Sequence, residues 1–256
     1  MQDILRRLAG APGSAALYYR PLDGESEAVT FRADAPLGAA SVIKLPIMIE
    51  AFRQIEAGLL DPEGEYVLRP EHKLPPCGVL TFMHDGLRVT LMDLITLMIV
   101  VSDNTATNMV IRIVGMENVN RTLAACGAMG TALRRVLYDS EASARGIQNS
   151  VTARDIGRLL EGLYRGEIVS PAASRRMLDI LRAQQLNGKF PFFLDCDIAH
   201  KTGEDDGITH GAGIIYAPRP FVLCLFSERT DVPAFERLMQ YAAKRLYELN
   251  AAPTGE

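Results

Sequence analysis

Strand-forming segments lie at the two ends of this 256-residue chain, and the long middle has a helical pattern. Short runs of apolar, β-branched and aromatic residues bounded by turn residues are typical of strands, whereas apolar residues at every third or fourth position indicate helices. The helical pattern extends from residue 39 to about 185, with loops at 62–64, 70–86 and 139–149. The predicted strands are residues 15–20, 28–32, 197–202, 209–217 and 220–227.

Strands this far apart in sequence share one sheet only if they pair across the helical middle. We therefore predict an α/β (α+β) fold: a mostly antiparallel five-stranded sheet, flanked by terminal helices at 1–8 and 232–249, with an inserted all-helical lobe. The whole chain would be one domain, with an α/β lobe of about residues 1–38 plus 196–256 and a helical lobe of about residues 39–195. A cleft is expected between the sheet and the helical lobe.

Composition argues against several classes of function. The formal net charge is −4 and the basic residues are scattered, so the chain has no electrostatic footprint for nucleic acid. No apolar run is long and uncharged enough to span a membrane. Cysteines and histidines lack metal-ligand spacing, so we predict no metal and no cofactor, and we expect Cys126 and Cys224 in the core.

The first eight residues read as a short amphipathic helix, without the apolar stretch and cleavage site of a signal peptide. The sequence as it stands is therefore expected to be cytoplasmic. The alternative is a secreted or periplasmic protein whose export signal has been trimmed. We expect a monomer.

Ser41 and Lys44 form an S-x-x-K motif at the start of an apolar run. Side chains three residues apart lie on one face of a helix. Pro46 fits only a first helical turn, which puts Ser41 at the positive end of the helix dipole. Because burial lowers the pKa of a lysine, a neutral Lys44 could take the proton from Ser41. The alternative for an isolated match is a capping serine beside a solvent-seeking lysine.

Two further motifs follow in the chain. Ser102 begins an S-D-N motif between two apolar helices, where Asp103 or Asn104 could be a plain N-cap. Lys201 begins a K-T-G motif on a strand-like run, and Gly203 would let a ligand backbone approach closely. A strand edge at this point can pair with a peptide-like substrate.

In this order, S-x-x-K, S-D-N and K-T-G resemble the motifs of class A β-lactamases and penicillin-binding proteins, a superfamily of serine acyl-transfer enzymes. The resemblance spans nearly the whole chain and implies the β-lactamase/transpeptidase-like fold. It also implies an acyl-enzyme on Ser41, with Lys44 as the base and Ser102 relaying a proton to the leaving group. Asn104 would orient Lys44 and the substrate amide.

The resemblance likewise implies the substrate-binding residues. Lys201 and Thr202 suit a carboxylate on the substrate, and Gly203 lies beside them. The oxyanion hole would be formed by the backbone amides of Ser41 and Glu204. The expected partner is a small β-lactam or a peptide-like acyl donor.

One feature of the class A enzymes is missing: a glutamate within an E-x-x-x-N loop that activates the hydrolytic water. The corresponding residues 138–149 form a shorter loop in which Asp139 and Glu141 are the only carboxylates. We predict Glu141 as the substitute. The alternative is a solvated carboxylate or an ion pair with Arg145.

Three functions stay open. The first is a serine hydrolase of the class A β-lactamase type, as in β-lactam breakdown and antibiotic resistance. The second is a D-alanyl-D-alanine peptidase or esterase with the same motifs, because such enzymes need no dedicated glutamate. The third is a sensor that is acylated once without turnover.

Overall fold

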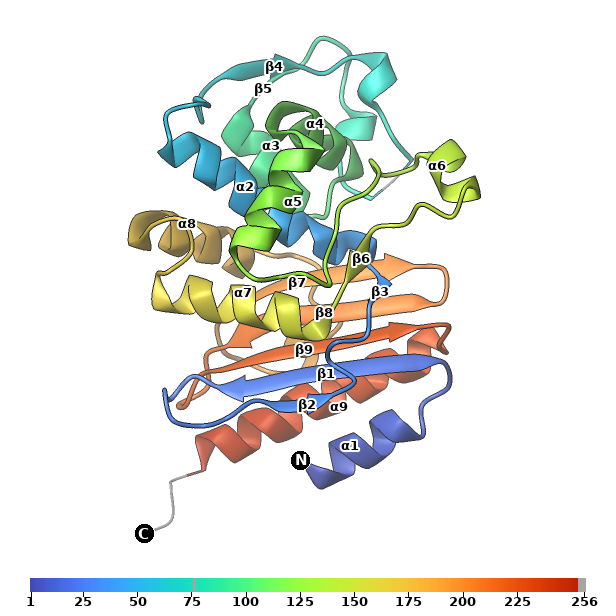
Figure 1. The fold of residues 1–256 in the computed structure, drawn as a ribbon, viewed down its shortest axis with the longest axis vertical. Helices are drawn as coiled ribbons and strands as arrows, with labels where there is room; N and C mark the ends of the chain where they lie inside the picture. The colour runs from blue at the N-terminus through green and yellow to red at the C-terminus, as the bar shows by residue number, and fades with distance from the viewer. Residues whose placement is uncertain (76, 253–256) are drawn as a thin grey trace.

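The computed structural model describes residues 1–75 and 77–252. Its centre is a five-stranded antiparallel sheet in the order β2-β1-β9-β8-β7, the architecture that the sequence predicts (Figure 1). The strands of this sheet are β1 (Ser14–Pro21), β2 (Val29–Phe31), β7 (Ile198–Asp205), β8 (Ile208–Ile215) and β9 (Phe221–Glu228).

The two ends of the chain are joined by β1 and β9, which pair over their full length from Ser14 opposite Glu228 to Pro21 opposite Phe221. Residues of β9 are buried along nearly its whole length, because helices cover both faces of the sheet. The strand β7 lies at the sheet edge and pairs only with β8 in the described part of the chain. The K-T-G motif is therefore on an edge strand.

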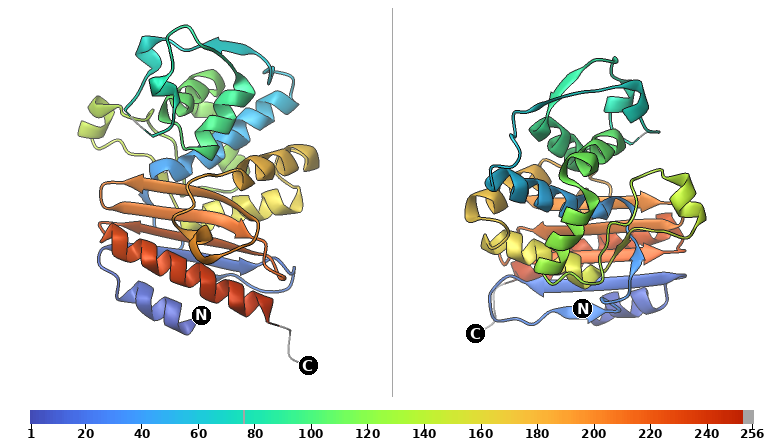
Figure 2. Two further views of the ribbon diagram at one scale, coloured as in Figure 1. Left: turned by 180° about the vertical axis from the view of Figure 1, so that it is seen from behind. Right: turned by 45° about the horizontal axis from the view of Figure 1, so that its top comes forward.

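Two terminal helices cover one face of the sheet, as Figure 2 shows from behind. They are α1 (Gln2–Ala9) and α9 (Val232–Ala251). The opposite face contacts α7 (Ala153–Arg165) and α8 (Pro171–Arg182). Each face has its own core, since strand side chains alternate between the two sides.

The remaining helices form the upper part of the molecule in Figure 1. An almost wholly apolar helix, α3, packs against α2, α4 and α8. There are two small antiparallel pairs, β3 with β6 and β4 with β5. Three of these strands, β4, β5 and β6, lie within the stretch predicted to be helical, and β3 lies just before it. Their bounds, with those of the helices, are α2 (Lys44–Glu56), α3 (Leu91–Val100), α4 (Asn104–Val114), α5 (Met116–Ala125), α6 (Ser140–Ala144), β3 (Leu37–Gly38), β4 (Glu65–Val67), β5 (Arg88–Thr90) and β6 (Ser150–Val151).

The expectation for the cysteines holds for only one of two residues. Cys224 is fully buried in β9, but Cys126 is exposed, so its predicted core position is wrong. Cys126 follows the last turn of α5 and lies within an exposed stretch, residues 124–127, before the chain returns to the core at Ala128. None of the helices in the described residues is long and apolar enough to cross a membrane. The division into two lobes at the stated boundaries stays a prediction.

Candidate active site

Ser41 lies in a short 3-10 helix, η1 (Ala40–Ile43), and Lys44 begins α2 directly after it. The S-x-x-K pair therefore spans the junction of two helix types, instead of lying within one α-helix as predicted. Ala40 has a φ of 41°, a left-handed conformation that costs energy for a residue with a Cβ. Strain of this kind just before Ser41 is a property of functional sites more often than of ordinary helix starts. Ser41 itself is half-buried.

The Lys44 ammonium is completely buried and fully hydrogen-bonded. Its Nζ donates to the Ser102 carbonyl at 2.8 Å, to Ser102 Oγ at 3.0 Å and to Asn104 Oδ1 at 2.9 Å. Burial lowers the pKa of Lys44 to about 7, although the nearby Cys77 and Asp103 act in the opposite direction. Lys44 can therefore exchange a proton near neutral pH.

Ser102 connects the three motifs. It lies between α3 and α4 with a φ of 54°, so the backbone turns sharply there. Its Oγ is 3.0 Å from Lys44 Nζ and 3.1 Å from Lys201 Nζ. A hydroxyl held between two amines can accept a proton from one side and pass its own to the other.

Asp103 is a helix N-cap, the structural alternative that the sequence left open. Its carboxylate caps α4 through the Ala106 amide at 2.8 Å. It also accepts from the amides of Val79 and Leu80 at 2.7 and 2.8 Å, which fixes the 77–80 segment beside the site. Asn104 is the first residue of α4, and its side-chain oxygen orients Lys44.

The K-T-G residues lie on β7, against η1. Lys201 is buried, and burial together with the nearby Lys44 holds the pKa of Lys201 well below its usual range. A side chain at position 203 would crowd η1, because a Cβ there would lie 3.1 Å from Val42 Cγ2 and 3.3 Å from Ala40 Cβ. Thr202 is buried as well, whereas the Glu204 side chain is exposed and ion-pairs with Lys189 at 3.1 Å.

Glu141 is not brought to this cluster by any described contact. Its side chain is exposed on α6, a single turn that Asp139 caps through the Ala142 amide at 2.9 Å. The part of the loop that meets α4 is Leu137, whose backbone is held by both ends of the Asn108 amide at 2.8 and 2.9 Å.

Two residues that sequence reasoning missed are thus Asn108 and Lys189. Asn108 is four residues after Asn104, so both lie on the same face of α4, and this spacing could have identified it. Lys189 stands in an irregular segment before Phe190 with no periodicity to mark it. Only the fold brings it to the strand that carries the K-T-G motif.

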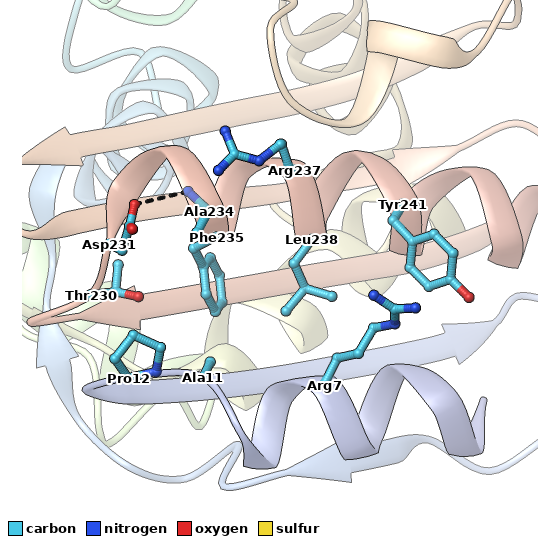
Figure 3. Close-up of a pocket in the computed structure, with 10 residues that line it drawn as sticks. All are labelled: Arg7, Ala11, Pro12, Thr230, Asp231, Ala234, Phe235, Arg237, Leu238 and Tyr241. Atoms are coloured by element: carbon cyan, nitrogen blue, oxygen red, sulfur yellow. Dashed lines mark hydrogen bonds between the residues drawn. The ribbon is translucent and has the colours of Figure 1, made fainter.

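No group of His, Cys, Asp and Glu side chains in residues 1–75 and 77–252 could hold a metal ion. A pocket of about 370 Å³ lies between α1 and α9 and includes Arg7, Phe235 and Tyr241 (Figure 3). It contains none of the motif residues and lies on the other side of the sheet from Lys44. The chemistry is therefore expected at the motif cluster and not in this pocket.

Comparison with solved structures supports the same assignment. The β-lactamase from Sphaerobacter thermophilus DSM 20745 is 28% identical, with a TM-score of 0.91, over 98% of this chain and 97% of that chain. PBP-A is also 28% identical, with a TM-score of 0.87, over 97% of this chain and 94% of that chain. The TLA-1 extended-spectrum β-lactamase is only 15% identical over 98% of both chains, with a TM-score of 0.87, so it is evidence for the fold alone.

No curated protein matches the chain in sequence. The family model described as the beta-lactamase enzyme family, in contrast, matches residues 1–249. This match covers all three motifs and nearly the whole fold. The chain is a PBP-A-like serine enzyme and belongs to the beta-lactamase enzyme family.

Proposed function

We propose that the protein is a serine hydrolase that is acylated on Ser41 by β-lactams and related acyl donors. The observation that carries this proposal is the position of Ser102 Oγ, 3.0 Å from Lys44 Nζ and 3.1 Å from Lys201 Nζ. A buried lysine with a pKa of about 7 is a competent base, and a bridging hydroxyl is a competent proton relay.

Acylation follows from these groups. Ser41 Oγ attacks the amide carbonyl of the donor, and its proton passes to neutral Lys44. The backbone amides of Ser41 and Glu204 stabilise the oxyanion. When the C–N bond breaks, Ser102 gives its proton to the leaving nitrogen and recovers one from the Lys44 ammonium. The product is an ester on Ser41; the amine stays attached to the acyl group when the donor is a β-lactam and departs when the donor is an open-chain amide.

Substrate binding is assigned to the K-T-G strand. Lys201 and Thr202 would bind the carboxylate of the acyl donor. The side chain of Asn104 would donate a hydrogen bond to the amide oxygen of the acyl donor. The missing side chain of Gly203 lets the edge strand pack closely against η1, which brings the K-T-G residues near Ser41. An edge strand also offers free backbone groups to a peptide-like donor.

Hydrolysis of the ester decides between two readings of the same site. With Glu141 as the base that activates water, the protein would be a β-lactamase of the class A type. Two observations on the described residues favour slow deacylation. The Glu141 side chain is exposed, and the hydrogen bonds that Lys44 donates go to neutral acceptors only.

A D-alanyl-D-alanine peptidase or esterase is therefore the second candidate. It is favoured by the exposure of Glu141, because such an enzyme needs no dedicated glutamate. One solved structure of PBP-A, a leucine-to-glutamate variant, is an acyl-enzyme complex with penicillin G. A sensor that remains acylated would use the same first step and is the third outcome of the test below.

Intact-protein mass spectrometry during incubation with penicillin G and with a chromogenic cephalosporin tests the proposal. We expect an adduct of one penicillin that is absent from the Ser41→Ala variant. A transient adduct with product accumulation would identify a β-lactamase, and a persistent adduct would identify a peptidase or a sensor. If wild type forms no adduct with either compound or with a D-alanyl ester, the proposed function is wrong.

A further inference from the structure

Lys189 is a buried cation behind the strand that carries the K-T-G motif. Only 3% of the residue is exposed. Its Nζ donates to the Gly203 carbonyl at 3.1 Å and to the His210 carbonyl at 3.2 Å. Gly203 and His210 are register partners on β7 and β8, so one ammonium ties the edge strand to its neighbour at this position.

The Gly203 carbonyl belongs to the same peptide group as the Glu204 amide, the oxyanion donor of the proposed function. In a trans peptide the C=O and N–H point in opposite directions, so fixing the carbonyl also fixes the direction of the N–H. A hydrogen bond from a charged donor is stronger than one from a neutral donor. Polarising the carbonyl strengthens the N–H of the same unit as a donor, by roughly 10–30% in condensed-phase estimates.

The other side of this peptide is also fixed. Gly203 faces η1, where its hypothetical Cβ would lie 3.1 Å from Val42 and 3.3 Å from Ala40. The Gly203–Glu204 peptide is thus held between the Lys189 ammonium and the 3-10 helix that presents Ser41. Both contacts restrict rotation of this peptide plane.

Two carboxylates balance the charge of Lys189. Glu204 Oε1 lies 3.1 Å and Glu236 Oε1 3.7 Å from Nζ. Burial lowers the pKa of Lys189 below its ordinary value, and both carboxylates oppose this shift in part. Thr209 Oγ1 holds the Glu236 carboxylate at 3.0 Å. The surroundings are therefore built for an ammonium and not for a neutral amine.

We infer that Lys189 is a positioning residue for acyl transfer: its ammonium orients and polarises the Gly203–Glu204 peptide, so that the Glu204 N–H is preset as an oxyanion donor. This inference rests on the proposed function, because it assumes that Ser41 is acylated. It assigns Lys189 no contact with the substrate.

The polarisation is testable without any substrate. In ¹³C,¹⁵N-labelled protein, Lys189→Met should move the Gly203 carbonyl carbon and the Glu204 amide nitrogen upfield, because a hydrogen bond to a carbonyl deshields both nuclei. Lys189→Arg should retain most of the wild-type shifts. If Lys189→Met fails to fold, Lys189→Gln, which keeps an N–H donor without the charge, replaces it. Unchanged shifts at both nuclei would overturn the inference.

Kinetics test the consequence for the reaction. Removing a complete oxyanion donor costs about 10²–10³ in rate, so weakening one should slow acylation by penicillin G about 10-fold. The ester carbonyl band of the isotope-edited acyl-enzyme should move to higher wavenumber in Lys189→Met. Glu236→Gln is the matched control: it removes a charge partner of Lys189 but leaves both carbonyl contacts, and we expect nearly wild-type acylation.

The outcomes separate the two proposals. If wild type is acylated and Lys189→Met reacts at the same rate with the same carbonyl band, the positioning role is wrong and the proposed function stands. If wild type is not acylated by penicillin or by an ester, the proposed function and the catalytic role of Lys189 both fail. A loss of rate that Lys189→Arg does not rescue would also contradict the inference, because it would indicate general destabilisation.

Discussion

Deprotonation of Lys44 near neutral pH should control how fast Ser41 is acylated. The ammonium is completely buried, and burial lowers its pKa from 10.5 to about 7. At pH 7 about half of the molecules would then carry a neutral Lys44, against roughly 3 in 10,000 at the ordinary pKa. The structure therefore supplies about a 10³-fold larger population of neutral Lys44, equivalent to about 4 kcal/mol.

The sign of the effect follows from which form is active. Acylation needs neutral Lys44, so its rate should rise about tenfold per pH unit below pH 7 and level off above about pH 8. Lys201 also donates to Ser102 Oγ, and burial together with the nearby Lys44 lowers the pKa of Lys201, so the inflection belongs to the pair of lysines. Lys44→Arg, whose guanidinium stays charged, should lose the inflection and at least about 10³-fold in rate.

The assay is single-turnover acylation by a chromogenic cephalosporin in stopped flow from pH 5 to pH 10. A rate that keeps rising to pH 10 would mean that Lys44 has an ordinary pKa. A rate that is flat over the whole range would mean that no lysine acts as the base. Either result would refute the reasoning from burial.

Stability gives an independent check on the same group. Between about pH 7 and pH 10.5 the unfolded chain binds a proton on Lys44 that the folded protein does not, so stability should rise with pH across this window. The slope from one such group is about 1.4 kcal/mol per pH unit. Urea unfolding of wild type and Lys44→Met at pH 7 and pH 9 measures it. Parallel changes in the two proteins would contradict a lowered pKa.

Three further outcomes are expected. Ser41→Ala should abolish labelling by a fluorescent penicillin while leaving the thermal midpoint within a few degrees, and persistent labelling would remove Ser41 as the nucleophile. If Glu141 activates water, Glu141→Gln should lengthen the lifetime of the acyl-enzyme. If instead the segment held by Asn108 faces the ester, Leu137→Glu should shorten the lifetime of the acyl-enzyme. Mass spectrometry of the adduct in both variants decides between these two arrangements. His210 is buried with a pKa of about 4, so the unfolded chain binds the proton first and the fold should lose up to about 3 kcal/mol of stability as pH falls from 6.5 to 4. In His210→Asn, the free energy of urea unfolding should depend less on pH in that window. An unchanged slope would refute this.

Much of the fold follows from local patterns. The paired strands β1 and β9 could be predicted because alternating apolar and polar residues, bounded by turn residues, indicate a strand wherever it lies in the chain. The three motifs were readable because their chemistry demands particular residue types at short, fixed spacing: a nucleophile one turn from its base, a hydroxyl before a helix cap, a cation before a glycine. These requirements are satisfied within four residues each.

Local patterns failed where a neighbour from elsewhere decides a residue's surroundings. Cys126 looks apolar and ends up exposed, and Glu141 is a suitable carboxylate that the fold leaves in solvent. The small pairs β3–β6 and β4–β5 have strands of two and three residues, too short for any periodicity to identify.

The sequence by itself determined the five strands of the main sheet and the terminal helices, and it marked Ser41, Lys44, Ser102 and Lys201 as the candidate site residues, because spacing and side-chain chemistry are local properties. Only the tertiary structure decided that Ser102 Oγ lies between two lysines, and that Lys189 Nζ donates to the Gly203 carbonyl. Those contacts join residues up to 99 positions apart. Burial, which makes Lys44 a base near neutral pH, likewise exists only once distant segments have excluded water from it.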